Sequence, residues 1–229
     1  MIAAYLRELE GGLAFDPALA SRVVAEVREH LADAAAEDEI ADRDEAEQRA
    51  VVRFGDPREL AAQFAAISLA RQARRVGLVM VLAILLVLAM MKARVAWYAL
   101  VAWTMPEDAR AVAGIVFEVN RYAFWMAVVI GIGAFLYIGL RNAPMRVDAG
   151  YRRQLRRAAL LFWVAATALS VSVTGDLILT ALRVGIGFSS EAVIPIASLS
   201  IEIALVAAVV FTTATTARRM ARTASAFGA

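Results

Sequence analysis

Cysteine is absent from the 229 residues, and histidine occurs once, as His30. Disulfide bonds and thiolate metal sites are therefore excluded, and one histidine cannot build an imidazole metal cluster alone. Enzyme signatures are also missing: we find no phosphate-binding loop, no GxSxG, no HExxH and no carboxylate pair in a soluble pocket. We expect no catalysis and no cofactor.

Apolar residues and an uneven charge distribution dominate instead. Hydrophobic residues make up 61% of the chain and the mean hydropathy is +0.64, which is too apolar for an ordinary soluble domain. Residues 1–68 carry a net charge of −8, and the remainder carries +10. Because the basic charge lies beside long apolar runs, it indicates membrane topology rather than nucleic-acid binding.

Four apolar runs are long enough to cross a bilayer. The sequence predicts an all-α protein: an acidic helical head of about four short helices (1–68), a basic helical junction (69–75) and a four-helix transmembrane bundle (76–229). Lys92 and Arg94, near the end of the first run, are expected to snorkel toward the membrane surface. The sequence does not decide whether residues 99–119 form a loop or a helical extension of the second run. The predicted spans are about 76–98, 120–140, 158–182 and 192–215.

Arginines predict the orientation in the membrane. They precede the first span, fill the loop 141–157 between the second and third, and follow the fourth. Positive loops face the cytoplasm, so we expect both termini on the cytoplasmic side of the membrane. The first 15 residues carry charges inside their only apolar run, and we expect no cleavable signal peptide.

The head contains several helix start and stop signals. Residues 2–13 predict a first amphipathic helix, and a cap and an N1 proline at Asp16-Pro17 predict a second that ends near Ala36. Asp42 and Glu45 form a capping-box signature for a third helix. Its inward residues are expected to be Ala46, Ala50, Val51 and Phe54, with Tyr5 also in the core.

The corner "FGDP" fuses a helix end to a helix start. Gly55 suits a left-handed C′ position after Phe54, Asp56 caps the next helix, and Pro57 occupies its first position. That helix is predicted to continue from Pro57 to about Tyr98, with Leu60, Phe64 and Ile67 along its apolar face. A helix shared by head and membrane would couple the two mechanically.

The head resembles the HAAS domain, a small helical signalling domain of bacterial membrane proteins. The resemblance rests on "YLRELE" (5–10), "EVREHL" (26–31) and "EAEQRAVVRFGDPRELA" (45–61), in that order. Such proteins are often encoded beside PadR-type transcription regulators, and similar heads precede some permeases. The resemblance therefore implies regulation or signalling without catalysis; it covers 1–68 only.

Two carboxylates inside the spans are candidate functional residues. Glu202 lies near the middle of the fourth span, where an ionised carboxylate costs about 2.5–3.5 kcal/mol. It could serve as a proton or cation site, but an interhelical hydrogen bond, with Ser198 or another span, is the favoured reading. Asp176 has Arg183 two turns after it, and an outward salt bridge or an interfacial carboxylate is favoured over a transport site. Whether Asp176 and Glu202 meet stays open.

Cations and the histidine give weaker candidates. Arg152, Arg153, Arg156 and Arg157 could bind anionic lipids or the acidic head, or serve only as the topology signal. His30 invites a pH-sensor role, yet a hydrogen-bonded structural histidine is favoured. No direct nucleic-acid contact is expected, and self-association stays open.

Two functions remain at this stage. The first is a membrane signalling protein whose head binds a protein partner, such as a PadR-like regulator, in response to a membrane or envelope state. The alternative is a small transporter or permease subunit that uses Glu202 as its coupling carboxylate.

Overall fold

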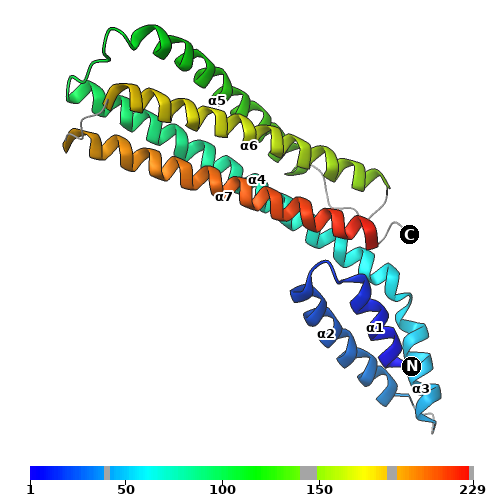
Figure 1. The fold of residues 1–229 in the computed structure, drawn as a ribbon. Coiled ribbons are helices and arrows are strands. Elements are labelled where there is room, and N and C mark those ends of the chain that lie inside the picture. The colour runs from blue at the N-terminus through cyan, green and yellow to red at the C-terminus, as the bar shows by residue number, and fades with distance from the viewer. Residues whose placement is uncertain (39–41, 140–148, 185–189, 227–229) are drawn as a thin grey trace. The chain divides into compact units, whose positions relative to one another are not determined.

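Three short helices precede four long ones in the computed structural model, which describes residues 1–38, 42–139, 149–184 and 190–226 (Figure 1). Those ranges contain no strand, so the predicted all-α fold is confirmed. The short helices are α1 (Ile2–Gly12), α2 (Pro17–Ala36) and α3 (Arg43–Phe54). The long helices are α4 (Pro57–Leu100), α5 (Arg110–Gly139), α6 (Ala149–Val184) and α7 (Val193–Ala226), and a 3-10 turn η1 (Ser190–Ala192) precedes α7.

The chain divides into two compact units. The first contains Met1–Gln72 together with two short segments, Asn142–Leu155 and Ala217–Ala229, and the second contains Ala73–Arg141 and Arg156–Thr216. We call the three short helices with the first turns of α4 the head, and the second unit the bundle. α4 contributes residues to both, because its helix continues without a break from Pro57 to Leu100. The continuous helix predicted from Pro57 to about Tyr98 is therefore confirmed.

Aspartates start the helices of the head as predicted. Asp16 accepts a hydrogen bond from the backbone N–H of Leu19 at 3.3 Å, and Pro17 follows it at the first helical position. Asp42 caps α3 through the N–H of Asp44 at 3.0 Å. These side chains satisfy amide groups that have no partner within the helix.

The corner between α3 and α4 also forms as expected. Gly55 ends α3 with a φ of 95°, a backbone conformation that glycine adopts without strain, and its N–H donates to the Val51 carbonyl at 3.2 Å. Its ψ of −168° differs from that of a left-handed helical residue, so the predicted αL geometry is wrong in detail. Asp56 then caps α4 through the N–H of Arg58 at 2.8 Å.

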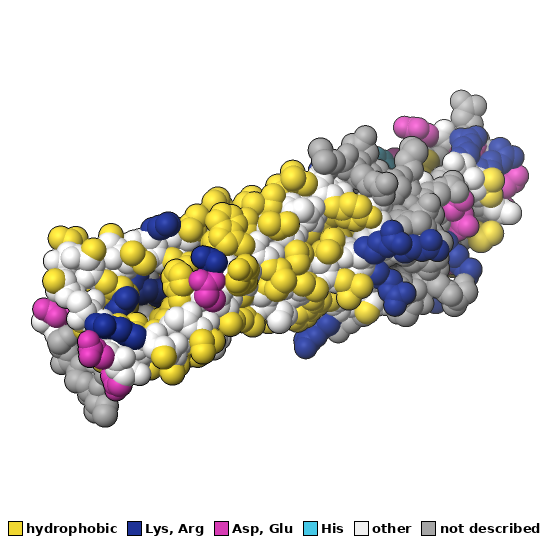
Figure 2. Space-filling view, turned by 90° about the horizontal axis from the view of Figure 1, so that it is seen from above, with side chains coloured by type: hydrophobic (Ala, Val, Ile, Leu, Met, Phe, Trp, Pro, Cys, Tyr) yellow, Lys and Arg dark blue, Asp and Glu magenta, His cyan; other side chains and the backbone are white. Residues whose placement is uncertain are grey.

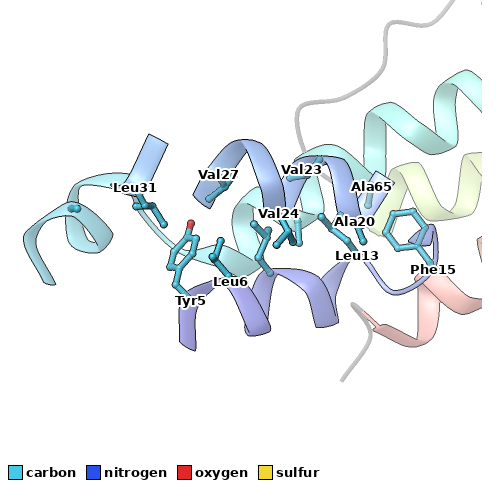
Figure 3. Close-up of a cluster of buried hydrophobic side chains, with 13 residues drawn as sticks. Tyr5, Leu6, Leu13, Phe15, Ala20, Val23, Val24, Val27, Leu31 and Ala65 are labelled. Atoms are coloured by element: carbon cyan, nitrogen blue, oxygen red, sulfur yellow. The ribbon is translucent and has the colours of Figure 1, made fainter. Parts of the chain in front are cut away.

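The core of the head lies between α1, α2 and the start of α4 (Figure 3). Leucine, valine and alanine side chains from these helices point toward one another, and Tyr5 closes one side of them. Burial raises the pKa of the Tyr5 hydroxyl, and the charges of Asp56 and Glu8 act in the same direction. The buried members are Tyr5, Leu6, Leu9, Leu13, Phe15, Ala20, Val23, Val24, Val27, Leu31, Ala50, Ala61 and Ala65.

Two apolar residues of the head are more exposed than the sequence suggested. Phe54, which was expected to point inward, is 38% exposed and makes an edge-on contact with Tyr5, whose ring centroid is 6.0 Å away. Ile67 is 51% exposed. The small residues Ala61 and Ala65 take the inward positions of α4 instead, because α1 packs too closely there for a larger side chain: a methyl group on Gly12 would lie 2.7 Å from the Cβ of Ala61.

The four long helices extend beyond the apolar runs that predicted them. α6 begins at Ala149 and α7 continues to Ala226, so residues 149–157 of the expected loop and residues 216–226 of the expected tail are helical. Residues 140–148 of that loop lie outside the described residues. Arginine, alanine and glutamine are good helix formers, so the backbone stays helical where hydropathy falls. α5 begins at Arg110, which resolves 110–119 as a helical extension of the second span.

All four long helices have the length and apolar composition needed to cross a membrane. Hydrophobic side chains cover the middle of these helices on the face seen in Figure 2, and charged groups gather toward their ends. Such exposure would be costly in water and is expected against lipid. Large exposed hydrophobic residues include Leu78, Leu82, Leu85, Val95, Ile115, Val129, Leu160, Val164, Ile201 and Phe211.

Leu9 provides a test of the head's packing, because its side chain has 0% exposure. We expect Leu9→Ala to lower the free energy of opening the head by about 2–5 kcal/mol, through lost apolar burial and a residual cavity. Hydrogen exchange of α1 and α2 in the full-length protein should accelerate by about thirtyfold or more. Val52→Ala is the control, since Val52 is 73% exposed; equal exchange in the two variants would contradict this core assignment.

Candidate functional site

An arginine and two carboxylates from three different helices meet inside the bundle. The Arg94 side chain on α4 places Nη2 2.8 Å from Oδ2 of Asp176 on α6, and Nη1 3.2 Å from Oε2 of Glu202 on α7. The side chains of Arg94, Asp176 and Glu202 are only 4%, 7% and 0% exposed. We call these three residues the charged cluster. It ties α4 to both other helices at a single level of the bundle.

Asn120 of α5 adds the fourth long helix to this arrangement. Its side-chain amide donates to Oδ1 of Asp176 at 2.7 Å, and its carbonyl oxygen accepts from the Ser172 hydroxyl at 2.6 Å. Gly175 makes this approach feasible, since a methyl group there would lie only 3.0 Å from the Asn120 Cβ. Oδ1 of Asp176 thus accepts a hydrogen bond from Asn120, and Oδ2 faces Arg94 in the ion pair.

One helical turn further along α6, a second polar layer joins α4 and α6. The hydroxyls of Tyr98 and Thr180 lie 3.2 Å apart and form a hydrogen bond. The guanidinium carbon of Arg183 lies 4.2 Å from the centroid of the Tyr98 ring, within range of a cation–π interaction. Trp103 packs edge-on against Tyr98, with the two ring centroids 5.9 Å apart.

These layers form part of the wall of a cavity of about 710 Å³ in the bundle. Its polar lining residues include Arg94, Asn120, Asp176, Thr180 and Arg183. The rest of the wall is largely apolar and comes from α4, α5, the connection between them and Leu179 of α6. Its volume and its few convergent polar groups are those of small-molecule sites in proteins. A hollow containing Lys or Arg side chains is visible near one end of the long helices (Figure 2).

The pairing explains how the membrane interior holds these charges. An isolated ion is costly in hydrocarbon. Arg94 lies within hydrogen-bonding distance of both carboxylates, so its positive charge partly neutralises the negative charges of Asp176 and Glu202. Glu202 and Asp176, whose meeting the sequence left open, are therefore joined through Arg94. Ser198, one turn before Glu202, donates to the Met90 carbonyl at 3.5 Å and adds a further link between α7 and α4.

The side chain of Arg94 lies where the sequence did not predict it. It does not snorkel to the surface, because its side chain is buried and paired. The pattern of α4 contains the missed signal: Arg94 follows Val87 by seven residues and Met80 by fourteen, and both are fully buried. A heptad spacing keeps these positions on one inward face. Arg183 stacks on Tyr98, so the expected pairing of Asp176 beside Arg183 is replaced by pairing with Arg94.

The remaining candidates lie at surfaces. Arg153, Arg156 and Arg157 are exposed on α6, and the side chain of Arg152 lies outside the described residues. His30 is exposed on α2. Val27 and Leu31 take the inward positions of that helix, and they direct His30 outward. In the part of the chain that the structure describes, no group of three metal-ligating side chains occurs.

Removing the guanidinium from the charged cluster should be costly. Arg94→Met leaves two carboxylates buried without their cation, and we expect a loss of about 3–5 kcal/mol in the free energy of unfolding. Thermal unfolding and size-exclusion profiles of the purified full-length protein measure it. Adding Asp176→Asn and Glu202→Gln to Arg94→Met removes the stranded charges and should restore much of the stability.

The matched control is Lys92→Met, which removes an exposed cation two residues away on the same helix. It should leave the melting temperature within about 2 °C of the parent, because exposed charges contribute little. If Arg94→Met and Lys92→Met melted at the same temperature, the cluster would not hold the helices together.

Comparison with known families connects the head to signalling proteins. Residues 4–63 match the family model HAAS, so the resemblance noted from the sequence is confirmed. No curated protein and no solved structure matches the chain. The match covers α1, α2, α3 and the first turns of α4 and leaves the bundle outside it. The chain thus combines a head similar to HAAS domains with four helices that are long and apolar enough to span a membrane.

Proposed function

We propose that this protein is a non-catalytic membrane signalling protein, in which the state of the bundle alters the head and the head binds a protein partner. The HAAS match supports a regulatory role for the head. The observation that carries the coupling is α4 itself. One unbroken helix places Ala61 and Ala65 in the core of the head and Arg94 in the charged cluster.

The coupling follows from the stiffness of a helix. Over 44 residues α4 extends about 66 Å, at about 1.5 Å per residue. A tilt or rotation of α4 in the bundle must therefore move Ala61 and Ala65 against the small core of the head. A shift of a few kcal/mol between two packing arrangements is sufficient to change partner binding.

A PadR-like regulator is the partner that the HAAS resemblance favours, and α3 offers a surface for it. Val52 is 73% exposed and Phe54 is 38% exposed, beside the charged side chains of Arg49 and Arg53. Apolar residues ringed by charges are typical of protein contacts. Membrane lipids contact the exposed apolar side chains of the bundle, and contact with nucleic acid would be left to the partner.

The proposed topology places the head in the cytoplasm at the bacterial inner membrane. Exposed arginines precede the apolar part of α4 (Arg71, Arg74, Arg75), and others lie at the start of α6 and near the end of α7. The connection between α4 and α5 carries Glu107 and Asp108 instead. This asymmetry follows the positive-inside rule.

Introduced cysteines test the topology cleanly, because the chain has none of its own. Asp108 is exposed, so the cysteine of Asp108→Cys should react with a membrane-impermeant maleimide in intact cells. Ala25→Cys, exposed on α2, should react only after the membrane is opened. Labelling of Ala25→Cys in intact cells would place the head outside and exclude the proposed partner.

A linker insertion tests the coupling. Asp176→Asn disturbs the charged cluster with little change in side-chain shape, and we expect it to change hydrogen exchange in α2 and α3 by about threefold or more. Inserting Gly-Ser-Gly-Ser between Gln72 and Ala73 should abolish that response. Inserting four alanines is the control, because four residues make close to one helical turn and keep the helix intact. An unchanged head in Asp176→Asn would refute the coupling.

A further inference from the structure

Two charged residues of the cavity wall, Asp176 and Arg183, each have a buried atom without a hydrogen-bond partner among the described residues. Oδ2 of Asp176 is in an ion pair with Arg94, whereas Arg183 has no such carboxylate partner in the described part of the chain. Arg94 and Asp176 are paired with each other, and Asn120 holds the second oxygen of Asp176. The Nε of Arg183 is buried and has no hydrogen-bond partner among the described residues. A buried donor without an acceptor costs free energy that a ligand can recover by supplying one.

The surroundings of Arg183 favour an anion over a cation. A ligand ammonium would seek the face of Tyr98, but the Arg183 guanidinium already lies 4.2 Å from the centre of that ring. The carboxylate of Asp176 is engaged by Arg94, 2.8 Å away. Arg94 is already shared between two carboxylates, Asp176 and Glu202, so Arg183 is the cation of the wall without a carboxylate partner among the described residues. A guanidinium binds a carboxylate or phosphate through two parallel hydrogen bonds.

The rest of the cavity favours an apolar body on that anion. Met91, Val95, Phe117 and Leu179 line it, together with small residues of α4 and α5. About 710 Å³ is ample for a ligand with a chain or ring system attached to its acid group. Apolar contact then supplies affinity, and the acid group fixes the orientation.

We propose that this cavity binds an amphiphilic anion, with its acid group paired to Arg183 and its apolar part against α4, α5 and α6. The inference rests on the proposed signalling function only where it treats the ligand as the stimulus. The binding itself depends on the cavity alone. The anion could reach the site as a free apolar acid from the aqueous side or as an anionic lipid from the bilayer. Both sources share the acid group and the apolar chain.

Octanoate is a suitable probe, with the full-length protein in nanodiscs of zwitterionic phosphatidylcholine. Saturation-transfer NMR should detect saturable binding of octanoate beyond that to empty nanodiscs. Octan-1-ol, which has the same chain without the charge, and octylammonium, which has the opposite charge, should bind at least about tenfold more weakly. Octylammonium binding as tight as octanoate would overturn the proposal.

Variants connect the binding to Arg183. Arg183→Met keeps the length of the side chain and should weaken octanoate binding by about tenfold or more, whereas Arg183→Lys keeps the charge and should weaken it less. Arg110→Met is the matched control, because Arg110 is exposed, pairs with Glu107 and does not line the cavity. Thermal unfolding verifies that each variant is folded. Equal octanoate affinity in Arg183→Met and the parent would also overturn the proposal.

Two further measurements show where the anion comes from and whether its binding alters the head. If phosphatidylglycerol in the nanodiscs competes with octanoate only when Arg183 is present, the bilayer supplies the anion; octanoate binding that phosphatidylglycerol leaves unchanged indicates a free acid. Either result supports an anion site. Octanoate that binds without altering hydrogen exchange of α2 and α3 would leave the site standing and contradict the proposed coupling to the head.

Discussion

The pairing of Arg94 with two carboxylates is the constraint on which the bundle depends. Each of the three charges would be costly alone in a membrane interior, and each comes from a different helix. The cost is reduced only where α4, α6 and α7 are aligned at one level, so the pairing specifies register as well as stability. Apolar contacts with lipid and with neighbouring helices are similar in strength and cannot specify register as sharply.

Asn120 and Gly175 extend this constraint to α5. The amide of Asn120 reaches Asp176 because Gly175 leaves room for it, so a small residue and a polar residue act together. The same polar groups also form one wall of the cavity. An occupant of the cavity therefore contacts residues that hold the four helices together, and a change in those contacts changes the balance between helix arrangements.

Local signals in the sequence predicted the helices well, because caps, prolines and apolar periodicity act over a few residues. Asp16, Asp42, Asp56 and Gly55 start or end helices where the sequence placed them. The charged cluster was harder to predict. Arg94 lies about 80 positions before Asp176, which lies 26 positions before Glu202, and the three meet only after the helices pack. Arg94 was misread because a cation near a span end more often reaches water, although its heptad spacing from Val87 indicated an inward face.

The position of Arg94 on α4 gives the buried charges a consequence beyond the bundle. α4 is the one described helix with side chains in the head core and in the charged cluster, and no proline or cap interrupts it between them. Arg94 lies about nine turns after Ala61, counted at 3.6 residues per turn. Its two carboxylate partners fix the rotation of α4 within the bundle, and the packing of Ala61 and Ala65 fixes the rotation of its first turns within the head. Electrostatic pairing in the bundle and close packing in the head therefore act on the same helix, which is the basis of the proposed coupling.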